Sequence, residues 1–263
     1  MNPFFFGSSG KQLFGIYHPP KTETVRGTGV LLCYPFGDEY MRTHKAMRQL
    51  PLQLSKVGFP LLRFDYFGTG DSAGDGEEAT IAQWLEDIGV AADELKETAG
   101  VSRISIVGLR LGGMLAALAA AARTDVDDLV LWDPIVDGAG YFRELLLPPP
   151  FLRDAPQAPP PRPDETAGAS GFPVPPALRA ALERLDLCAE PLTGPRRISL
   201  IVSHEAADYA RFAEHLRARP GFQQRHVASP APWIEPEKNG GAMVLPHEII
   251  QAIVNDLSEE RRP

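Results

Sequence analysis

The chain has 263 residues, of which 44% are hydrophobic and 23% charged, and its formal net charge is −8. This composition is typical of a globular protein and argues against wholesale disorder. An acidic balance without a basic stripe makes nucleic acid and anionic membranes unfavourable partners. Two cysteines form no disulfide framework, and we expect a cytoplasmic protein without a signal peptide or a membrane span.

Short apolar runs alternate with longer helical patterns along most of the chain. In chain order we expect strands at 4–6, 11–18, 29–34, 59–66, 103–107, 129–132, 198–202 and 224–228. We expect helices at 43–57, 80–98, 111–123, 176–187, 208–219 and 246–257. The alternation predicts an α/β fold with a mostly parallel central sheet and helices on both faces.

The alternation is interrupted by a proline-rich segment. Eleven of the 26 prolines lie between residues 148 and 176, too many for a helix or a central strand. We therefore predict that residues 139–193 are an insertion into a core formed by residues 1–138 and 194–263.

The sequence Gly108-Leu109-Arg110-Leu111-Gly112 lies between a predicted strand and a predicted helix. This is the context of a nucleophile elbow, Gly-x-Ser-x-Gly, in which a strained turn presents the nucleophile. Arg110 stands where the serine is required. The sequence 70–74 also matches the pattern around Ser72, but no helix begins there, so we reject Ser72 as the nucleophile.

Three motifs together resemble a known family: residues 33–37 (CYPFG), 64–72 (FDYFGTGDS) and 108–113 (GLRLGG). They are similar to the serine aminopeptidase-like branch of the α/β-hydrolase superfamily, especially to exosortase-associated and biosynthetic-cluster hydrolase-like proteins. The resemblance covers nearly the whole chain outside the proline-rich segment. It implies an α/β-hydrolase fold in which residues 139–193 form a cap over the pocket.

The resemblance also assigns expected roles to particular positions. Oxyanion-hole amides would come from Leu111 and from Phe36 or Gly37, and these backbone donors do not depend on a serine. The acid position has Glu205 and Asp208 nearby, with Asp133 as an alternative, and His247 is the nearest candidate for the histidine.

Arg110 cannot replace a serine chemically, because its guanidinium stays protonated and offers only hydrogen-bond donors. At a helix N-terminus it needs a nearby anion, for which Asp38, Glu39, Asp133 and Asp137 are candidates. It either forms a salt bridge that fills a defunct pocket or binds a substrate carboxylate.

Three further residues are weaker candidates. His44 starts a predicted helix near the mouth of the site and is either a surface residue or a catalytic one. Phe142 and Leu145 line the pocket or simply pack against the core. The histidines have no metal-ligand spacing and no nucleotide-binding motif exists, so we predict no metal and no cofactor.

Three functions remain open from the sequence. The first is a biosynthetic enzyme with non-hydrolytic or acyl-related chemistry on a small molecule or a carrier-bound acyl group, with Asp133 or His247 transferring protons and Arg110 stabilising charge. The second is a pseudo-hydrolase that binds or scaffolds. The third is an atypical hydrolase in which Asp133 or His247 activates water.

Overall fold

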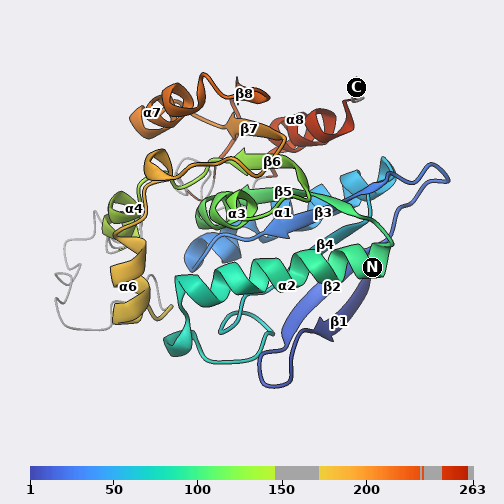
Figure 1. Ribbon diagram of the computed structural model, residues 1–263, viewed down its shortest axis with the longest axis horizontal. Helices are drawn as coiled ribbons and strands as arrows, with labels where there is room; N and C mark the ends of the chain where they lie inside the picture. Colours follow the sequence, from blue (N-terminus) through green and yellow to red (C-terminus); the bar gives the residue numbers. More distant parts are fainter. Residues whose placement is uncertain (146–171, 232, 234–244, 260–263) are drawn as a thin grey trace.

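The computed structural model describes residues 1–145, 172–231, 233 and 245–259. Eight strands form one sheet in the order β1-β2-β4-β3-β5-β6-β7-β8 (Figure 1). The strands are β1 (Asn2–Phe6), β2 (Leu13–His18), β3 (Thr28–Cys33), β4 (Leu61–Phe64), β5 (Arg103–Leu109), β6 (Val126–Trp132), β7 (Arg197–Val202) and β8 (Phe222–His226). The helices are α1 (Asp38–Lys56), α2 (Ile81–Ala99), α3 (Leu111–Ala121), α4 (Gly138–Leu145), α6 (Pro176–Leu182), α7 (Ala207–Leu216) and α8 (His247–Ser258), with short 3-10 turns at Gly76–Glu78 and Leu187–Ala189.

The sheet is antiparallel at one edge and parallel over the rest. β1 pairs with β2 and β2 with β4 in antiparallel fashion, whereas every later pairing, from β4–β3 to β7–β8, is parallel. The predicted fold class, with a mostly parallel sheet, is confirmed. Because the parallel strands all end at the same edge, the loops that follow them meet there.

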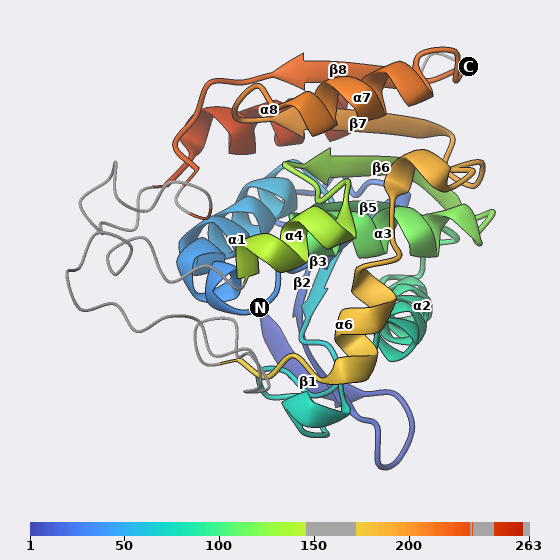
Figure 2. The same ribbon diagram turned by 90° about the vertical axis from the view of Figure 1, so that its left-hand side faces the viewer.

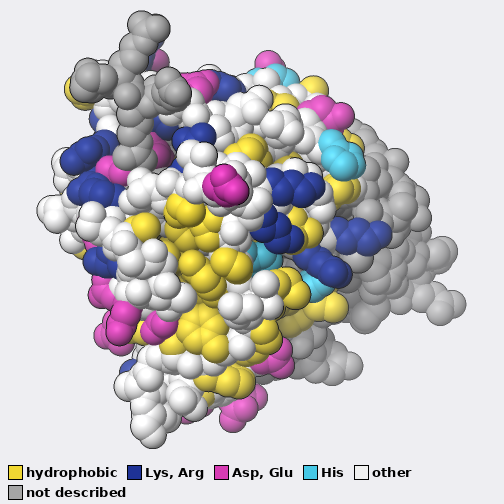
Figure 3. Space-filling view, turned by 90° about the vertical axis from the view of Figure 1, so that its right-hand side faces the viewer, with side chains coloured by type: hydrophobic (Ala, Val, Ile, Leu, Met, Phe, Trp, Pro, Cys, Tyr) yellow, Lys and Arg dark blue, Asp and Glu magenta, His cyan; other side chains and the backbone are white. Residues whose placement is uncertain are grey.

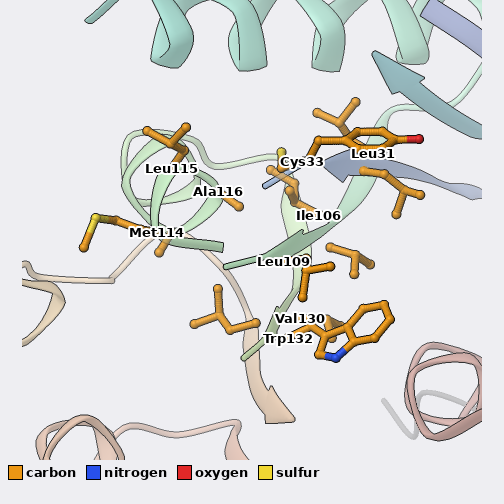
Figure 4. Packing of buried hydrophobic residues seen from close by; sticks show 14 of the residues in the cluster. Leu31, Cys33, Ile106, Leu109, Met114, Leu115, Ala116, Val130 and Trp132 are labelled. Carbon is orange, nitrogen blue, oxygen red and sulfur yellow. The ribbon is translucent and has the colours of Figure 1, made fainter. Parts of the chain in front are cut away.

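Helices cover both faces of the sheet. Figure 2 shows α1 and α8 together on one side of the strands and α2 and α3 on the other, and both pairs of helices are in contact. The central strands are therefore buried on both faces, which explains why β3, β5 and β6 consist largely of aliphatic residues. Figure 4 shows Leu31, Ile106 and Val130 of these strands among the buried side chains, together with Leu115 of α3.

Helix α1 begins at Asp38, whereas the sequence predicted a start at Thr43. Gly37, with φ 64°, makes the turn that precedes the helix. Asp38 and Glu39 then occupy the first turn, where acidic side chains interact favourably with the helix dipole. The earlier start matters because it brings Glu39 to the edge of the sheet where the functional site is expected.

Strand β6 is also longer than predicted. It begins at Val126 and includes Asp127 and Asp128, which are buried although they are charged. Their carboxylates lie 2.7 Å from the guanidinium groups of Arg103 and Arg197, respectively. Hydropathy alone cannot reveal such a start, because buried charges are tolerated only when a partner far away in the sequence pairs with them.

The described ends of the predicted insertion are helical. Residues 138–145 form α4, which was not predicted as a helix, and α6 ends at Leu182 instead of residue 187. The two helices contact each other at the end of the molecule where the parallel strands terminate. Most of the proline-rich segment, residues 146–171, lies outside the described residues, so the boundaries of the cap remain a prediction.

The surface opposite α4 and α6 carries both hydrophobic and basic side chains (Figure 3). Figure 3 shows hydrophobic side chains in the middle of the face opposite α4 and α6, with Lys and Arg side chains beside them. None of the helices within the described ranges is both long enough and apolar enough to cross a bilayer.

Candidate functional site

The turn between β5 and α3, residues 108–112, has the geometry of an elbow. Arg110 has φ 53° and ψ −122°, a conformation that L-residues rarely adopt. A Cβ at Gly108 would lie 2.4 Å from the Gly112 carbonyl oxygen, and one at Gly112 would lie 2.3 Å from that of Tyr34. Close backbone contacts therefore leave room only for glycine at these two positions. Both glycines are present although the residue between them is not a serine.

The Arg110 side chain is buried in a cluster of polar groups. Its Nε lies 2.7 Å from Glu39 Oε1, and its Nη2 lies 3.0 Å from Glu144 Oε2. The hydroxyl of Tyr141 donates to the other Glu39 oxygen at 2.9 Å, and the Arg110 guanidinium carbon lies 5.6 Å from the centre of the Tyr141 ring. Arg110, Glu39 and Tyr141 therefore fill the space in front of the elbow.

The charges in this cluster compensate each other. Burial alone would lower the pKa of Arg110, but the negative charges of Glu39 and Glu144 outweigh it and raise that pKa above its ordinary value. Burial raises the pKa of Glu39, and the Arg110 guanidinium and the Tyr141 hydroxyl oppose that rise. Arg110 and Glu39 are 7% and 8% exposed, so the pair lies almost entirely out of water.

Sequence analysis anticipated Glu39 as an anion near Arg110 but missed Tyr141 and Glu144. Both come from α4, and their spacing of three residues places them on one face of a helix. A predicted helix at this point would have revealed that shared face. The other proposed partner in this loop, Asp38, is instead bonded to Arg42 on the surface of α1.

Asp133 lies beyond the end of β6 and is fully buried. Its carboxylate accepts hydrogen bonds from the Ser203 amide and hydroxyl, both at 2.7 Å, and from the Trp233 indole at 3.2 Å. Burial raises its pKa, and the Ser203 hydrogen bonds oppose that rise. The backbone of Asp133 is strained, with φ 41°. Its side-chain carboxylate connects the end of β7 to residue 233.

The remaining candidates from the triad positions lie at the surface. His247 is the first residue of α8 and is exposed, as is His44 on α1. Glu205 lines an open groove of about 740 Å³ between α7 and β8, and the exposed Asp208 lies 3.7 Å from Arg211. Among the described residues, Arg110 forms its ion pairs with Glu39 and Glu144, and no hydrogen bond or ion pair connects it to any of these groups.

Ser72 has a structural role in the loop after β4. Its hydroxyl donates to the Asp65 carbonyl oxygen at 2.5 Å and accepts from the Phe14 amide at 2.9 Å. The first interaction lies within the loop itself and the second ties the loop to β2, and the hydroxyl is not placed at the start of a helix.

A cavity of about 230 Å³ adjoins the elbow at Leu111, and the residues of the Arg110 cluster are not among those that the structure describes in its lining. Aromatic side chains dominate its lining: Tyr34, Phe36, Tyr40, Tyr66, Trp84 and Phe172. Phe172 and Pro173 come from the described end of the predicted cap, and the Phe172 ring centre lies 6.3 Å from that of Phe36. Phe142 and Leu145 were expected either to line the pocket or to pack against the core. Phe142 packs beneath the Arg179 guanidinium, and Leu145 is partly buried against the core.

The three predicted oxyanion-hole residues, Phe36, Gly37 and Leu111, all line this cavity. The backbone amides of Phe36 and Leu111 have no hydrogen-bond acceptor among the described residues. Such unpaired N–H groups beside a cavity can bind a carbonyl oxygen or an oxyanion. Asp65, which lies at the end of β4, contributes the charged side chain to the described lining. No group of three side chains suited to a metal occurs within the described part of the chain.

Comparison with solved structures supports the fold. An esterase from Pyrococcus furiosus matches over 97% of this chain and 89% of its own, with 14% identity and a TM-score of 0.66. The bottromycin epimerase BotH, solved in complex with bottromycin A2, matches over 98% of both chains with 19% identity and a TM-score of 0.61. Identities this low establish a shared fold and leave the activity open.

Comparison with curated proteins is more limited. The chain is 38% identical over 69 residues to the human palmitoyl-protein thioesterase ABHD10, and this match spans 26% of the chain and 21% of the thioesterase. The chain thus spans about a fifth of the length of the curated relatives that it matches. No family model matches the sequence. Sheet order, elbow and structural neighbours together identify the chain as an α/β-hydrolase-fold protein.

Proposed function

We propose that the protein binds a small, largely apolar molecule in the cavity beside the elbow and does not act through a serine nucleophile. The observation that carries this proposal is the cavity itself, about 230 Å³ in volume. Its described lining includes six aromatic side chains and the amides of Phe36 and Leu111, which have no acceptor among the described residues. Apolar pockets with a few convergent polar groups are the usual form of small-molecule sites. The volume suits a small molecule or the end of a carrier-bound acyl group.

The Arg110 cluster argues against covalent chemistry at the elbow. A guanidinium is no nucleophile, and this one already interacts with two carboxylates. A ligand carboxylate would have to displace Glu39 or Glu144 to reach it. The ligand is therefore expected to engage the amides through a carbonyl oxygen and not to depend on Arg110 for an ion pair.

An enzyme of a biosynthetic pathway is the second candidate, favoured by the two unpaired amides on the cavity. They would stabilise the negative oxygen formed when the carbon next to a carbonyl group gives its proton to a base, and Asp65 is the carboxylate of the described lining that would accept it. Asp133 and His247, the proton-transfer groups expected from the sequence, are absent from the described lining of the cavity. The fold accommodates such chemistry in a neighbour, since BotH is an epimerase.

Binding is tested with phenylacetone, an uncharged aryl ketone, by isothermal titration calorimetry. Ala79 is buried and lines the cavity, so Ala79→Leu fills part of it and is expected to weaken binding at least tenfold. Ala180→Leu on the exposed side of α6 is the matched control and should bind as the wild type does. Equal binding by both variants, or none by the wild type, would contradict the proposal.

The two candidates are separated by hydrogen exchange. Phenylacetone incubated with the protein in D₂O is followed by NMR for replacement of its methylene protons by deuterium from solvent. A binding protein leaves the exchange at the uncatalysed rate, whereas a proton-transfer enzyme accelerates it and loses the acceleration in Ala79→Leu.

A further inference from the structure

Asp65 is a buried carboxylate on the wall of the cavity. It follows β4, is 7% exposed and lines the cavity together with Tyr40. The Tyr40 hydroxyl donates to Asp65 Oδ1 at 3.0 Å, and the Asp71 amide donates to Oδ2 at 3.1 Å. A carboxylate can accept about four hydrogen bonds, so each of its oxygens retains capacity for another donor.

No cationic side chain within the described residues forms an ion pair with Asp65. The nearby Arg63 is directed elsewhere, because its Nη1 donates to Tyr34 at 3.0 Å and its Nε to His18 at 3.3 Å. Burial raises the pKa of Asp65, and the two hydrogen bonds together with the nearby charge of Arg63 oppose that rise. Three other buried carboxylates, those of Glu39, Asp127 and Asp128, each lie 2.7 Å from an arginine nitrogen. Asp87 and Asp133 are held by hydrogen bonds, as Asp65 is, but neither is among the described residues that line the cavity.

A buried carboxylate costs free energy unless a cation or sufficient hydrogen bonds compensate it. At Asp65 the compensation is partial, and the space next to it is a cavity instead of an arginine. The walls of that cavity are aromatic, and aromatic faces attract cations, most strongly when water is excluded. A carboxylate surrounded by aromatic rings is therefore complementary to an organic cation.

We propose that the cavity binds an organic cation, a protonated or alkylated amine with an apolar body, whose charge lies against the Asp65 carboxylate among the aromatic rings. The proposal rests on the function proposed above and adds the chemical class of the ligand. An amine at Asp65 and a carbonyl oxygen at the amides of Phe36 and Leu111 use different parts of the same cavity.

A purely structural role explains only half of the geometry. Oδ2 accepts the Asp71 amide and so stabilises the turn after β4, which an asparagine could do without the cost of a buried charge. Oδ1 has no role in that turn, since its donor is Tyr40 of α1, another residue of the cavity wall. The charge is thus placed where a ligand can reach it.

The test compares phenethylamine with 2-phenylethanol, which has nearly the same shape and no charge at neutral pH. Calorimetry gives the two dissociation constants, and quenching of tryptophan fluorescence that disappears in Trp84→Phe locates the binding in the cavity. We expect the wild type to bind the amine at least tenfold more tightly. In Asp65→Asn that preference should fall below threefold, while the affinity for the alcohol changes less than threefold.

Asp71→Asn is the matched control, because Asp71 is an exposed carboxylate of the same turn and its backbone amide is retained. It should keep the full preference for the amine. Equal affinity of the wild type for amine and alcohol would overturn the proposal, and this comparison requires no variant. A preference that persists in folded Asp65→Asn would overturn it as well. Failure of both compounds to bind would instead contradict the proposed function itself.

Discussion

The two sides of the elbow differ in how they fill the space at the carboxyl edge of the sheet. On one side, Arg110, Glu39 and Tyr141 form a buried network of charged and hydrogen-bonded groups. On the other side, aromatic side chains around Phe36 and Trp84 leave a cavity of about 230 Å³. The nucleophile position is occupied by a salt bridge, whereas the adjoining space stays open. The residues at the nucleophile position therefore differ from those around the cavity in which we propose that a ligand binds.

The largest expected effect comes from breaking the polar side. Arg110→Ala leaves Glu39 buried without its partner, which should lower the free energy of unfolding by about 3–5 kcal/mol in urea denaturation. The double variant Arg110→Met with Glu39→Gln removes both charges and should recover most of that loss. A loss below 1 kcal/mol in Arg110→Ala would show that the pair does not hold this side together.

The Arg110→Ala variant also tests whether binding in the cavity is independent of the Arg110 cluster. Folded Arg110→Ala should bind phenylacetone within about threefold of the wild type, since Arg110 is not among the described residues that line the cavity. Loss of binding beyond tenfold, measured by calorimetry, would favour Arg110 as part of the ligand site and would end the comparison drawn above.

A smaller loss of unfolding free energy is expected for a change in the wall of the cavity. Leu115 is buried and lines the cavity, whereas Leu200 is buried in β7 away from it. Leucine-to-alanine changes in cores cost about 2–5 kcal/mol, and the cost depends on how well the site is packed. Leu115→Ala should fall near the low end and Leu200→Ala near the high end in parallel urea denaturation. The reverse order would indicate that the cavity wall is packed as tightly as the core.

Within the polar side, the two carboxylates should differ. The Glu144 side chain is 62% exposed and lies 3.0 Å from Arg110, so water screens the pair. Glu144→Gln is expected to change the unfolding free energy by about 0–1 kcal/mol. Glu39→Gln removes the buried partner and should cost more. Equal costs for the two variants would mean that exposure does not distinguish them.

The last prediction is that a serine-directed probe gives no labelling. A serine-directed fluorophosphonate should not label the wild type, because Arg110 replaces the nucleophile and Ser72 is held in a loop by two hydrogen bonds. Arg110→Ser should also remain unlabelled, since Asp133 is fully bonded elsewhere and His247 is exposed on α8. Mass spectrometry after labelling checks both, and a label on Ser72 would refute the assignment of the elbow.

Local patterns were sufficient for the fold because the core strands are nearly continuous aliphatic runs. The strand that leads into the elbow, the glycines that flank Arg110 and the helix after it were all recognisable from spacing and residue type. The prediction failed where burial depends on distant partners. The charged residues Asp127 and Asp128 do not look like part of a buried strand, so the predicted start of β6 is too late. The predicted start of α1 is also too late, by more than one turn.

For the site, the sequence by itself determined that Arg110 stands between the two glycines of the elbow, and it predicted that Phe36, Gly37 and Leu111 lie near it. That no serine nucleophile acts here is the proposal made above. Only the tertiary structure decided what surrounds these residues. Glu39 was one of several acids in reach, and Glu144 and Asp65 were not considered, because the pairing of charges depends on distances between segments far apart in the chain. A cavity likewise arises from how side chains of several elements fail to fill a space, which no single segment encodes.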